Sequence, residues 1–289
     1  MRNSLSLFFY DTYDYFWRSA DSLFQVGTSI YERDWELLIL LDGCRYDTFE
    51  SVKSGYPYLG TNKPIYSVGS SSKTWMGRTF THEYREEQSV TAYVTGNPYS
   101  RRLLDDEMFA VVDHIWEYAW DDETGTIYPQ PITDRAIDIW RSKDPGRMIV
   151  HYMQPHYPFL NHPELHEGID LDYFGNQPTD SVWACLRSNE ANKPEVKKAY
   201  RENLEIVLDN IKTLVENISA ESTVLTADHG NAFGEFGQYG HPNHTLNPYV
   251  RKVPWCRIET VDNHTYEPSL DPGPERNNLE SKLEDLGYL

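Results

Sequence analysis

The stretch that decides the fold is residues 35–42, WELLILLD, in which an apolar run ends at Asp42. Unbroken apolar residues suit a strand that is buried on both faces, because such a strand turns no side to water. Strands of this kind belong to parallel sheets that helices cover. The run therefore predicts an inner strand with a carboxylate at its carboxyl end.

Working outward, four further stretches carry strand signals. They are residues 91–95, which stop at the turn sequence Gly96-Asn97-Pro98, and residues 147–153, 222–227 and 253–258. Helical spacing of apolar residues occurs at 131–142, 194–218 and 279–289, the last with Gly287 as the residue that ends the helix. Strands that alternate with helices predict an α/β fold, a mostly parallel sheet flanked by helices on both faces.

The chain organisation predicted from the sequence is one domain over residues 1–289. A length of 289 residues fits one large α/β domain, and neither a repeat nor a low-complexity tract divides it. Residues 1–33 are expected to form a helical extension. Residues 160–192 are polar and irregular, which indicates a lid or an insertion.

The net charge is −19, from 45 acidic and 26 basic residues. Nucleic acid is excluded as a partner, because binding it requires a basic face that neutralises phosphates. An acidic, halophile-like surface adapted to high salt is the preferred interpretation, and attraction of cations or of a basic partner is the alternative. Three widely spaced cysteines without a CxxC pair argue against a disulfide framework or a structural zinc site.

The N-terminus bears on localisation. It carries neither the apolar core nor the cleavage site of a secretory signal, so a cytoplasmic protein is expected. No apolar run is long enough for a transmembrane helix. Weak contact with a membrane surface through Phe8, Phe9, Tyr10 and Phe16 is the alternative to simple packing.

Polar side chains follow three of the predicted strands. Asp42 follows the first, His151 and His156 lie at the end of 147–153, and Asp228-His229 follow 222–227. Parallel strands bring their carboxyl ends to one edge, where ligands bind. Asp and His suit Mn²⁺, Mg²⁺ or Zn²⁺, whereas a single aspartate after a strand is more often only a helix N-cap.

The segment GSSSKTWMGRTF, residues 69–80, offers hydroxyl groups at Ser70, Ser71, Ser72 and Thr74. A hydroxyl at the start of a helix lies beside backbone N–H groups that favour phosphate or sulfate. Coordination to a divalent cation would activate such a hydroxyl as a nucleophile. A plain loop with a helix N-cap is the alternative.

Three motifs together resemble the alkaline phosphatase superfamily, in its sulfatase-like and lipoteichoic-acid-synthase-like branch. They are LLDGCRYDTF (40–49), HYMQPHYPF (151–159) and TADHGNAFGEFGQYGHP (226–242), and their order and spacing match from about residue 35 to residue 260. The resemblance implies an alkaline-phosphatase-like fold and an enzyme that acts on phosphate or sulfate esters.

The resemblance also implies roles for individual residues. Metal ligands are expected at Asp42, Asp228 and His229, with Ser72 as both metal ligand and nucleophile. Thr74, and then Ser71, are the alternative nucleophiles, and Thr74 otherwise contacts substrate.

Two histidines match catalytic positions of the family. His156 matches the histidine that contacts the transferred group or the leaving oxygen, and His241 matches a later histidine near the substrate oxyanion. His151 faces the same strand end and is assigned to substrate binding. Arg45 and Asp47 match the first motif and are expected to form an ion pair that fixes the loop.

Departures from the family pattern narrow the prediction. The Cys-x-Pro-Ser-Arg motif of formylglycine sulfatases is absent, and Gly43 stands where many sulfatases have a second aspartate. The Asp-x-x-x-His of two-metal members is also missing beside His156. One divalent cation, Mn, Mg, Zn or Ca, is therefore expected rather than two.

The resulting function is a metal-dependent hydrolase or transferase of a phosphate or sulfate ester, with a Ser or Thr nucleophile. Its anionic substrate is expected to belong to a glycan or a lipid-linked head group. One alternative is a phosphomonoesterase or phosphomutase of the same superfamily. The other is a non-catalytic protein that binds a glycan or a partner.

Overall fold

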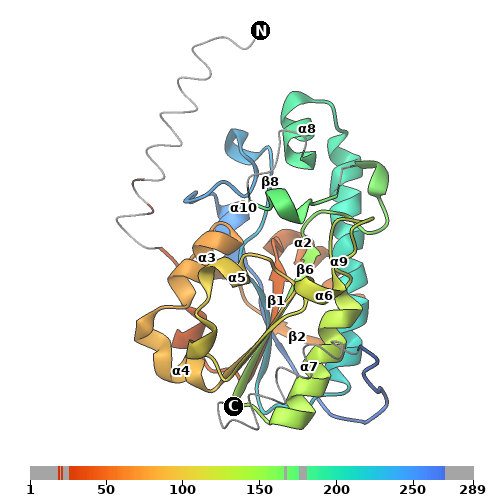
Figure 1. Ribbon diagram of the computed structural model, residues 1–289. Coiled ribbons are helices and arrows are strands. Elements are labelled where there is room, and N and C mark those ends of the chain that lie inside the picture. The colour runs from red at the N-terminus through yellow and green to blue at the C-terminus, as the bar shows by residue number, and fades with distance from the viewer. Residues whose placement is uncertain (1–18, 20, 22–25, 166–167, 176–180, 271–289) are drawn as a thin grey trace.

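A seven-stranded sheet forms the centre of the computed structural model, which describes residues 19, 21, 26–165, 168–175 and 181–270 (Figure 1). The strand order is β2-β11-β7-β1-β6-β4-β5. The strands are β1 (Leu37–Asp42), β2 (Leu59–Asn62), β4 (Thr91–Thr95), β5 (Val111–His114), β6 (Arg147–Pro155), β7 (Thr223–Ala227) and β11 (Trp255–Ile258).

The apolar run occupies the middle of this sheet as β1, which pairs in parallel with β6 on one side and β7 on the other. Leu37 to Leu41 are fully buried. Each such side chain gains about 1.5–3 kcal/mol from leaving water, which explains why this run forms the innermost layer. The prediction of a buried central strand is confirmed.

Strands β7, β1, β6, β4 and β5 are all parallel, and only β11 opposes its neighbours β7 and β2. The predicted mostly parallel sheet is therefore confirmed. The reversal of β11 follows from the path of residues 228–254, which contain β8 (Ala232–Phe233), β9 (Tyr239–Gly240), α10 (Pro248–Arg251) and β10 (Lys252–Val253). Since these residues include no long crossover helix, the chain re-enters the sheet from the edge at which β7 left it.

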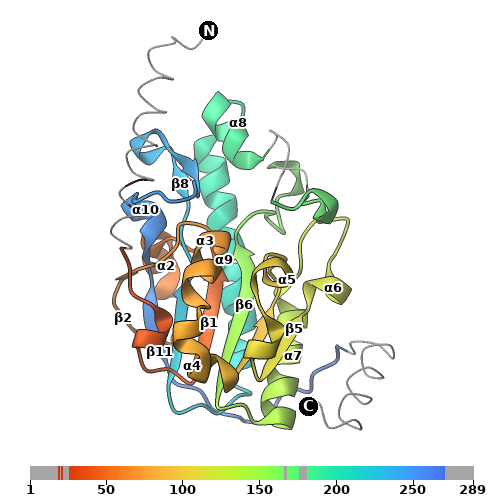
Figure 2. The same ribbon diagram turned by 60° about the vertical axis from the view of Figure 1, so that its left-hand side comes forward.

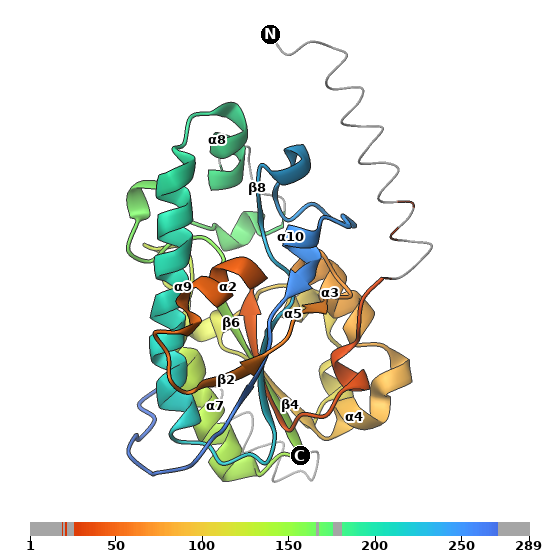
Figure 3. The ribbon, with the colours of Figure 1, turned by 180° about the vertical axis from the view of Figure 1, so that it is seen from behind.

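Helices cover both faces of the sheet, as predicted. Figure 2 shows α3 (Ser72–Thr79) and α4 (Arg85–Ser89) in front of the strands, with α7 (Pro129–Lys143) and α9 (Lys193–Val215) behind. Figure 3 shows α2 (Tyr46–Lys53) beside α9. The predicted helices 131–142 and 194–218 correspond to α7 and α9, whose apolar stripes are buried.

Several elements were not predicted. The edge strands β2 and β5 are short and partly exposed, so they lack a long apolar run as a signal. The other unpredicted short elements are β3 (Ile65–Tyr66), α5 (Ser100–Leu103), α6 (Trp116–Ala119), η2 (His82–Tyr84), η3 (Asp106–Met108) and η6 (Glu235–Gly237), whereas η1 (Ile30–Glu32) lies within the predicted helical extension.

Some predictions fall outside the described residues. These are most of the helical extension in residues 1–33 and the helix at 279–289. Within the described parts of 1–33, residues 30–32 form the short 3₁₀ helix η1. Of the helices described, none combines the length and the apolar character that crossing a bilayer requires.

The segment 160–192 packs through a second, smaller apolar cluster. Its described elements are η4 (Pro163–Leu165), η5 (Leu171–Tyr173) and α8 (Val182–Ser188). Trp183 and Leu186 of α8 contact a cluster that includes Tyr200 of α9 and Phe233 of β8. The segment is thus anchored beside the carboxyl end of the sheet, while its role as a lid stays a prediction.

His162 joins this segment to α9 through two carboxylates. Its Nδ1 lies 3.0 Å from Glu164 Oε1, and its Nε2 contacts Glu202 Oε2. Hydrogen bonds to Glu202 and then Glu164 raise the pKa of His162 above 6.5, and the same contact lowers the pKa of Glu202. Protonated His162 therefore binds both carboxylates at mildly acidic pH.

We expect the His162 contact to stabilise the fold by about 1 kcal/mol or less, since it is near the surface. A raised histidine pKa gives stability that is complete below pH 6.5 and is lost as pH rises through the folded-state pKa. His162→Gln should remove that part of the pH dependence in urea unfolding. The control is His82→Gln, at an exposed histidine. Equal pH profiles for wild type and His162→Gln would contradict the assignment.

Candidate functional site

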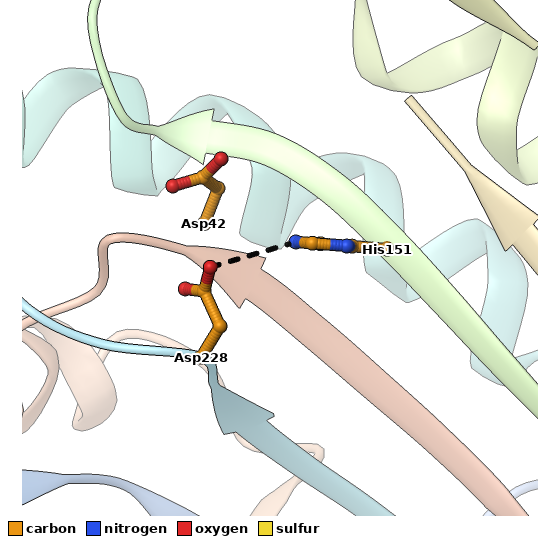
Figure 4. A group of neighbouring side chains, drawn as sticks. All are labelled: Asp42, His151 and Asp228. Atoms are coloured by element: carbon orange, nitrogen blue, oxygen red, sulfur yellow. Dashed lines mark ion pairs between the residues drawn. The ribbon is translucent and has the colours of Figure 1, made fainter. Parts of the chain in front are cut away.

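Three polar side chains meet at the carboxyl edge of the sheet, in its centre. Asp42 ends β1, His151 lies in the neighbouring strand β6, and Asp228 follows β7 on the other side. Their ligand atoms all lie within 4.8 Å of one another, and all three side chains are buried (Figure 4). The predicted convergence of strand ends is therefore present, and it includes His151.

The turn after β1 is built to receive Asp228. Gly43 has φ +67°, a left-handed conformation that glycine adopts without strain. Its N–H donates to Asp228 Oδ1 at 2.9 Å, and the N–H of His229 donates to the same oxygen at 2.8 Å. One oxygen of Asp228 is thus held by the backbone, which leaves Oδ2 free to face Asp42 and His151.

Gly43→Ala should destabilise the protein by more than the cost of placing an alanine at a positive φ angle. A Cβ at residue 43 would stand 2.6 Å from Asn231 Nδ2, whereas at Gly237, with φ +72°, it would meet nothing within 4 Å. We expect Gly237→Ala to cost about 1 kcal/mol and Gly43→Ala about 1–3 kcal/mol more. Urea unfolding of both variants measures the difference. Equal losses would show that the turn tolerates a side chain.

Three buried atoms at the centre of the site have no hydrogen-bond partner among the described residues: Asp42 Oδ1, Asp228 Oδ2 and His151 Nε2. His151 Nε2 lies 4.0 Å from Asp228 Oδ2. Burial and the nearby carboxylate of Asp228 raise the pKa of Asp42 well above its usual 3.8. Two buried carboxylates this close repel each other when both are ionised, and a cation bound between them would remove that repulsion.

The donor set fits a divalent cation. Carboxylate oxygen and neutral imidazole nitrogen are ligands for Mn²⁺, Zn²⁺ and related ions. Burial lowers the pKa of His151 to about 4, which keeps the imidazole neutral at pH 7. Its Nδ1 is hydrogen-bonded to the Tyr93 hydroxyl at 2.7 Å, so Nε2 faces the carboxylates. Asp42, His151 and Asp228 therefore form a candidate site for a divalent cation.

His229 adds a further nitrogen to this set. Its Nδ1 donates to the carbonyl of Gly230 at 2.9 Å, which leaves the lone pair on Nε2. That nitrogen lies 3.5 Å from Asp42 Oδ1 and 3.5 Å from Asp228 Oδ2. The structure thus places both predicted carboxylates and His229 around one point.

The hydroxyl of Ser72 also lies beside the candidate cation site. Ser72 is the first residue of α3, and its Oγ lies 3.3 Å from Asp42 Oδ2 and 3.4 Å from His229 Nε2. Both Ser72 and Asp42 are buried. The position of this hydroxyl at the N-terminal end of a helix favours an anionic group beside it.

The alternative hydroxyls are engaged in starting that helix. Ser71 is the N-cap of α3, and Thr74 completes a capping box with it. Ser71 Oγ also donates to Asn243 Oδ1 at 2.7 Å, while Thr74 Oγ1 accepts from the N–H groups of Ser70 and Ser71. No contact of either hydroxyl with Asp42, Asp228 or His229 is present among the described residues.

His156 and His241 form a hydrogen-bonded pair next to His229. Their Nε2 atoms are 3.0 Å apart, and the ring of His241 lies 4.5 Å from that of His229. His156 Nδ1 lies 2.5 Å from the carbonyl of Tyr157. Burial, followed by the neighbouring His229, lowers the pKa of His156 to about 4 and lowers that of His241 in the same way. Both imidazoles are therefore neutral at pH 7.

Arg45 and Asp47 form the ion pair that the sequence indicated. Two guanidinium nitrogens of Arg45 donate to Asp47 at 2.8 and 2.6 Å. Arg45 also donates to the carbonyl of Asn231 at 2.9 Å and to Glu235 at 3.0 Å. The pair therefore ties the loop after β1 to the loop that follows His229.

Two side chains of the site were not predicted. Asn97 Nδ2 donates to Asp42 Oδ2 at 2.8 Å, and Tyr93 orients His151. Asn97 appeared in the sequence only as part of a turn, and Tyr93 only as part of a strand. Tyr93 lies within β4 and Asn97 follows it, and the pairing of β4 with β6 brings both near the site. The order of strands in the sheet is therefore the information that would have identified them.

No known protein-family model matches the chain, and neither does any curated protein. Solved structures do match. The soluble domain of lipooligosaccharide phosphoethanolamine transferase A from Neisseria meningitidis aligns with TM-score 0.50 and 12% identity, over 76% of this chain and 75% of that one. A candidate sulfatase from Bacteroides thetaiotaomicron aligns with TM-score 0.50 and 12% identity, over 82% of this chain and 66% of that one. These likenesses confirm the predicted alkaline-phosphatase-like α/β fold.

Proposed function

We propose that this protein is a metal-dependent hydrolase or transferase of phosphate or sulfate esters, with Ser72 as its nucleophile. The observation that carries the proposal is the position of Ser72 Oγ, within 3.4 Å of both Asp42 and His229. The neighbouring atoms Asp42 Oδ1, Asp228 Oδ2 and His151 Nε2 are buried without partners among the described residues. A hydroxyl beside a cation site has the arrangement of an activated nucleophile.

The residues that would hold the cation are Asp42, Asp228, His229 and His151, together with Ser72. A divalent cation bound there supplies positive charge that favours the ionised serine and the anionic ester. One cation suffices for these ligands. This is the single-metal arrangement expected from the sequence.

In the first step, Ser72 Oγ forms a bond to phosphorus or sulfur, and the bond to the leaving alcohol oxygen breaks. The N-terminal end of α3 favours the charge that gathers on the remaining ester oxygens. The hydroxyl proton of Ser72 points towards Asp42 Oδ2. This proton leaves Ser72 as the new bond forms and ends on the leaving oxygen, so the products are an ester of Ser72 and a free alcohol.

The two histidines supply the proton transfers. The carbonyl of Tyr157 can only accept, so His156 Nδ1 carries a proton and its Nε2 accepts from His241 Nε2. The lone pair of His241 therefore sits on Nδ1, which has no partner among the described residues. His241 Nδ1 takes the proton of the incoming water or alcohol when the serine ester is resolved. That proton passes to Ser72 Oγ as the bond from Ser72 breaks, which restores both the hydroxyl and the neutral imidazole.

The substrate belongs, in this proposal, to a glycan or a lipid-linked head group that bears the ester. Support comes from the shared fold of a transferase named for lipooligosaccharide and phosphoethanolamine. Because a candidate sulfatase has a similar fold, the proposal includes sulfate esters as well as phosphate esters. A hydroxyl of the acceptor, or water, would complete the reaction.

Chromogenic aryl esters test the proposal. The purified protein is freed of metal with EDTA and then assayed with phosphate monoesters, phosphodiesters and sulfate esters in the presence of Mn²⁺, Mg²⁺, Zn²⁺ or Ca²⁺. We expect turnover of one ester class that depends on the cation and that a second EDTA treatment removes. Cation-independent turnover, or none with every combination, would contradict the proposal.

A further inference from the structure

The turn between β4 and α5, residues 96–99, lies at the same sheet edge as the candidate site. Its first N–H, from Gly96, donates to the carbonyl of His151 at 3.0 Å. The side chain of Asn97 reaches across to Asp42 Oδ2 at 2.8 Å. The turn therefore contacts two of the residues that surround the candidate cation site.

Asn97 is held from several sides, so its amide cannot turn away. Only 1% of the residue is exposed. The side-chain Oδ1 of Asn97 accepts from the backbone N–H of Tyr99 at 2.9 Å, and the backbone N–H of Asn97 donates to Thr95 Oγ1 at 3.0 Å. Because the acceptor end of the amide is occupied by Tyr99, the donor end must face Asp42.

A chain of hydrogen-bonded side chains, which runs from buried Ser100 to exposed Asp106, supports this turn further along. Ser100 donates its N–H to the carbonyl of Asn97, and its Oγ lies 2.7 Å from His114 Nδ1. His114 Nε2 lies 3.2 Å from Asp106 Oδ2. This Ser-His-Asp arrangement is not a second hydrolytic site, because Ser100 is fully buried and its Oγ also accepts from Trp116. It serves to fix the turn.

The contact with Asn97 makes the two oxygens of Asp42 different. Oδ2 accepts from Asn97 and from Ser72, whereas Oδ1 has no partner among the described residues and lies 3.5 Å from His229 Nε2. Without the amide of Asn97, the plane of the carboxylate could turn, so that no oxygen would be held pointing at the cation. Such a rotation would weaken it as a cation ligand.

We propose that Asn97 is a positioning residue that holds Asp42 turned with Oδ1 towards the cation, and so sets the cation affinity of the site. This inference rests on the proposed function. Residues that orient metal ligands typically change metal affinity or activity by about 10- to 100-fold when they are replaced. Asn97 should have an effect of that size without touching the cation.

The test is a titration of the purified full chain with Mn²⁺, in which free Mn²⁺ is read by electron paramagnetic resonance. Asn97→Ser keeps an oxygen that can accept from the N–H two residues on, but it is too short to reach Asp42. Asn97→Ala removes both contacts. We expect both variants to bind Mn²⁺ about 10- to 100-fold more weakly than wild type.

Asn217→Ala is the matched control. Asn217 is equally buried, but its side chain accepts from the N–H groups of Thr265 and Tyr266 and makes no hydrogen bond to a site residue among the described residues. It should lower the melting temperature and leave Mn²⁺ affinity within about twofold. Wild-type affinity in folded Asn97→Ser would overturn this inference alone. A wild-type protein that binds neither Mn²⁺ nor Mg²⁺, Zn²⁺ or Ca²⁺ would overturn the proposed function and this inference together.

Discussion

Ser72→Ala is expected to abolish turnover, with a loss of about 10⁴-fold or more, while the protein stays folded. The physical reason is that no other hydroxyl in the described chain shares contacts with Asp42 and His229. Binding of Mn²⁺ should survive, because Asp42, Asp228 and His229 are unchanged. The measurement is steady-state turnover of the best aryl ester beside a Mn²⁺ titration of the same sample.

Ser71→Ala and Thr74→Ala are the controls for Ser72. Both residues belong to the capping box of α3, so each replacement should cost about 1 kcal/mol of stability. Their turnover should fall far less than that of Ser72→Ala. Full activity in Ser72→Ala, with loss in one of the other two variants, would move the nucleophile to that residue.

Asp228→Asn should weaken cation binding and, at the same time, stabilise the metal-free fold. Loss of this carboxylate removes a proposed ligand of the cation, so affinity should fall by more than the roughly 100-fold typical of outer residues. Without metal, however, the variant should be more stable than wild type, by on the order of 1–4 kcal/mol. The reason is that Asp42 and Asp228 repel each other when both are ionised. The amide oxygen that the substitution introduces can still accept from the N–H groups of Gly43 and His229.

Asp134→Asn is the matched control for this variant. Asp134 is also buried, but its carboxylate accepts from the Tyr266 hydroxyl and from the N–H groups of Ser269 and Leu270. Its replacement should destabilise the protein and leave Mn²⁺ affinity unchanged. Thermal unfolding in EDTA and in Mn²⁺ measures both variants. A metal-free Asp228→Asn protein that is less stable than wild type would contradict the repulsion on which the site is argued.

Those parts of the site that lie at strand ends could be predicted from the sequence. Asp42 and Asp228 each follow a buried apolar run, and parallel strands carry such residues to one edge. Ser72 was indicated by the resemblance to the family, and the structure places its hydroxyl beside Asp42 and His229. Even the ion pair of Arg45 with Asp47 is local, since only one residue separates them.

The remaining parts depend on contacts between distant residues. Asn97 meets Asp42 only because β4 lies beside β6, which itself lies beside β1. His151 was assigned to substrate, whereas strand register places its Nε2 beside Asp228, and Tyr93 decides which nitrogen points there. A sequence pattern records neither strand order nor the tautomer of a buried histidine.

Elemental analysis of the purified wild-type chain, prepared without chelator, tests the central claim most directly. The account predicts one divalent cation per chain, Mn, Mg, Zn or Ca, and its loss from Asp228→Asn prepared in parallel. Two cations per chain would favour the phosphomonoesterase or phosphomutase alternative. No bound cation, even after soaking with each metal, would contradict the account and leave a non-catalytic binding protein as the better explanation.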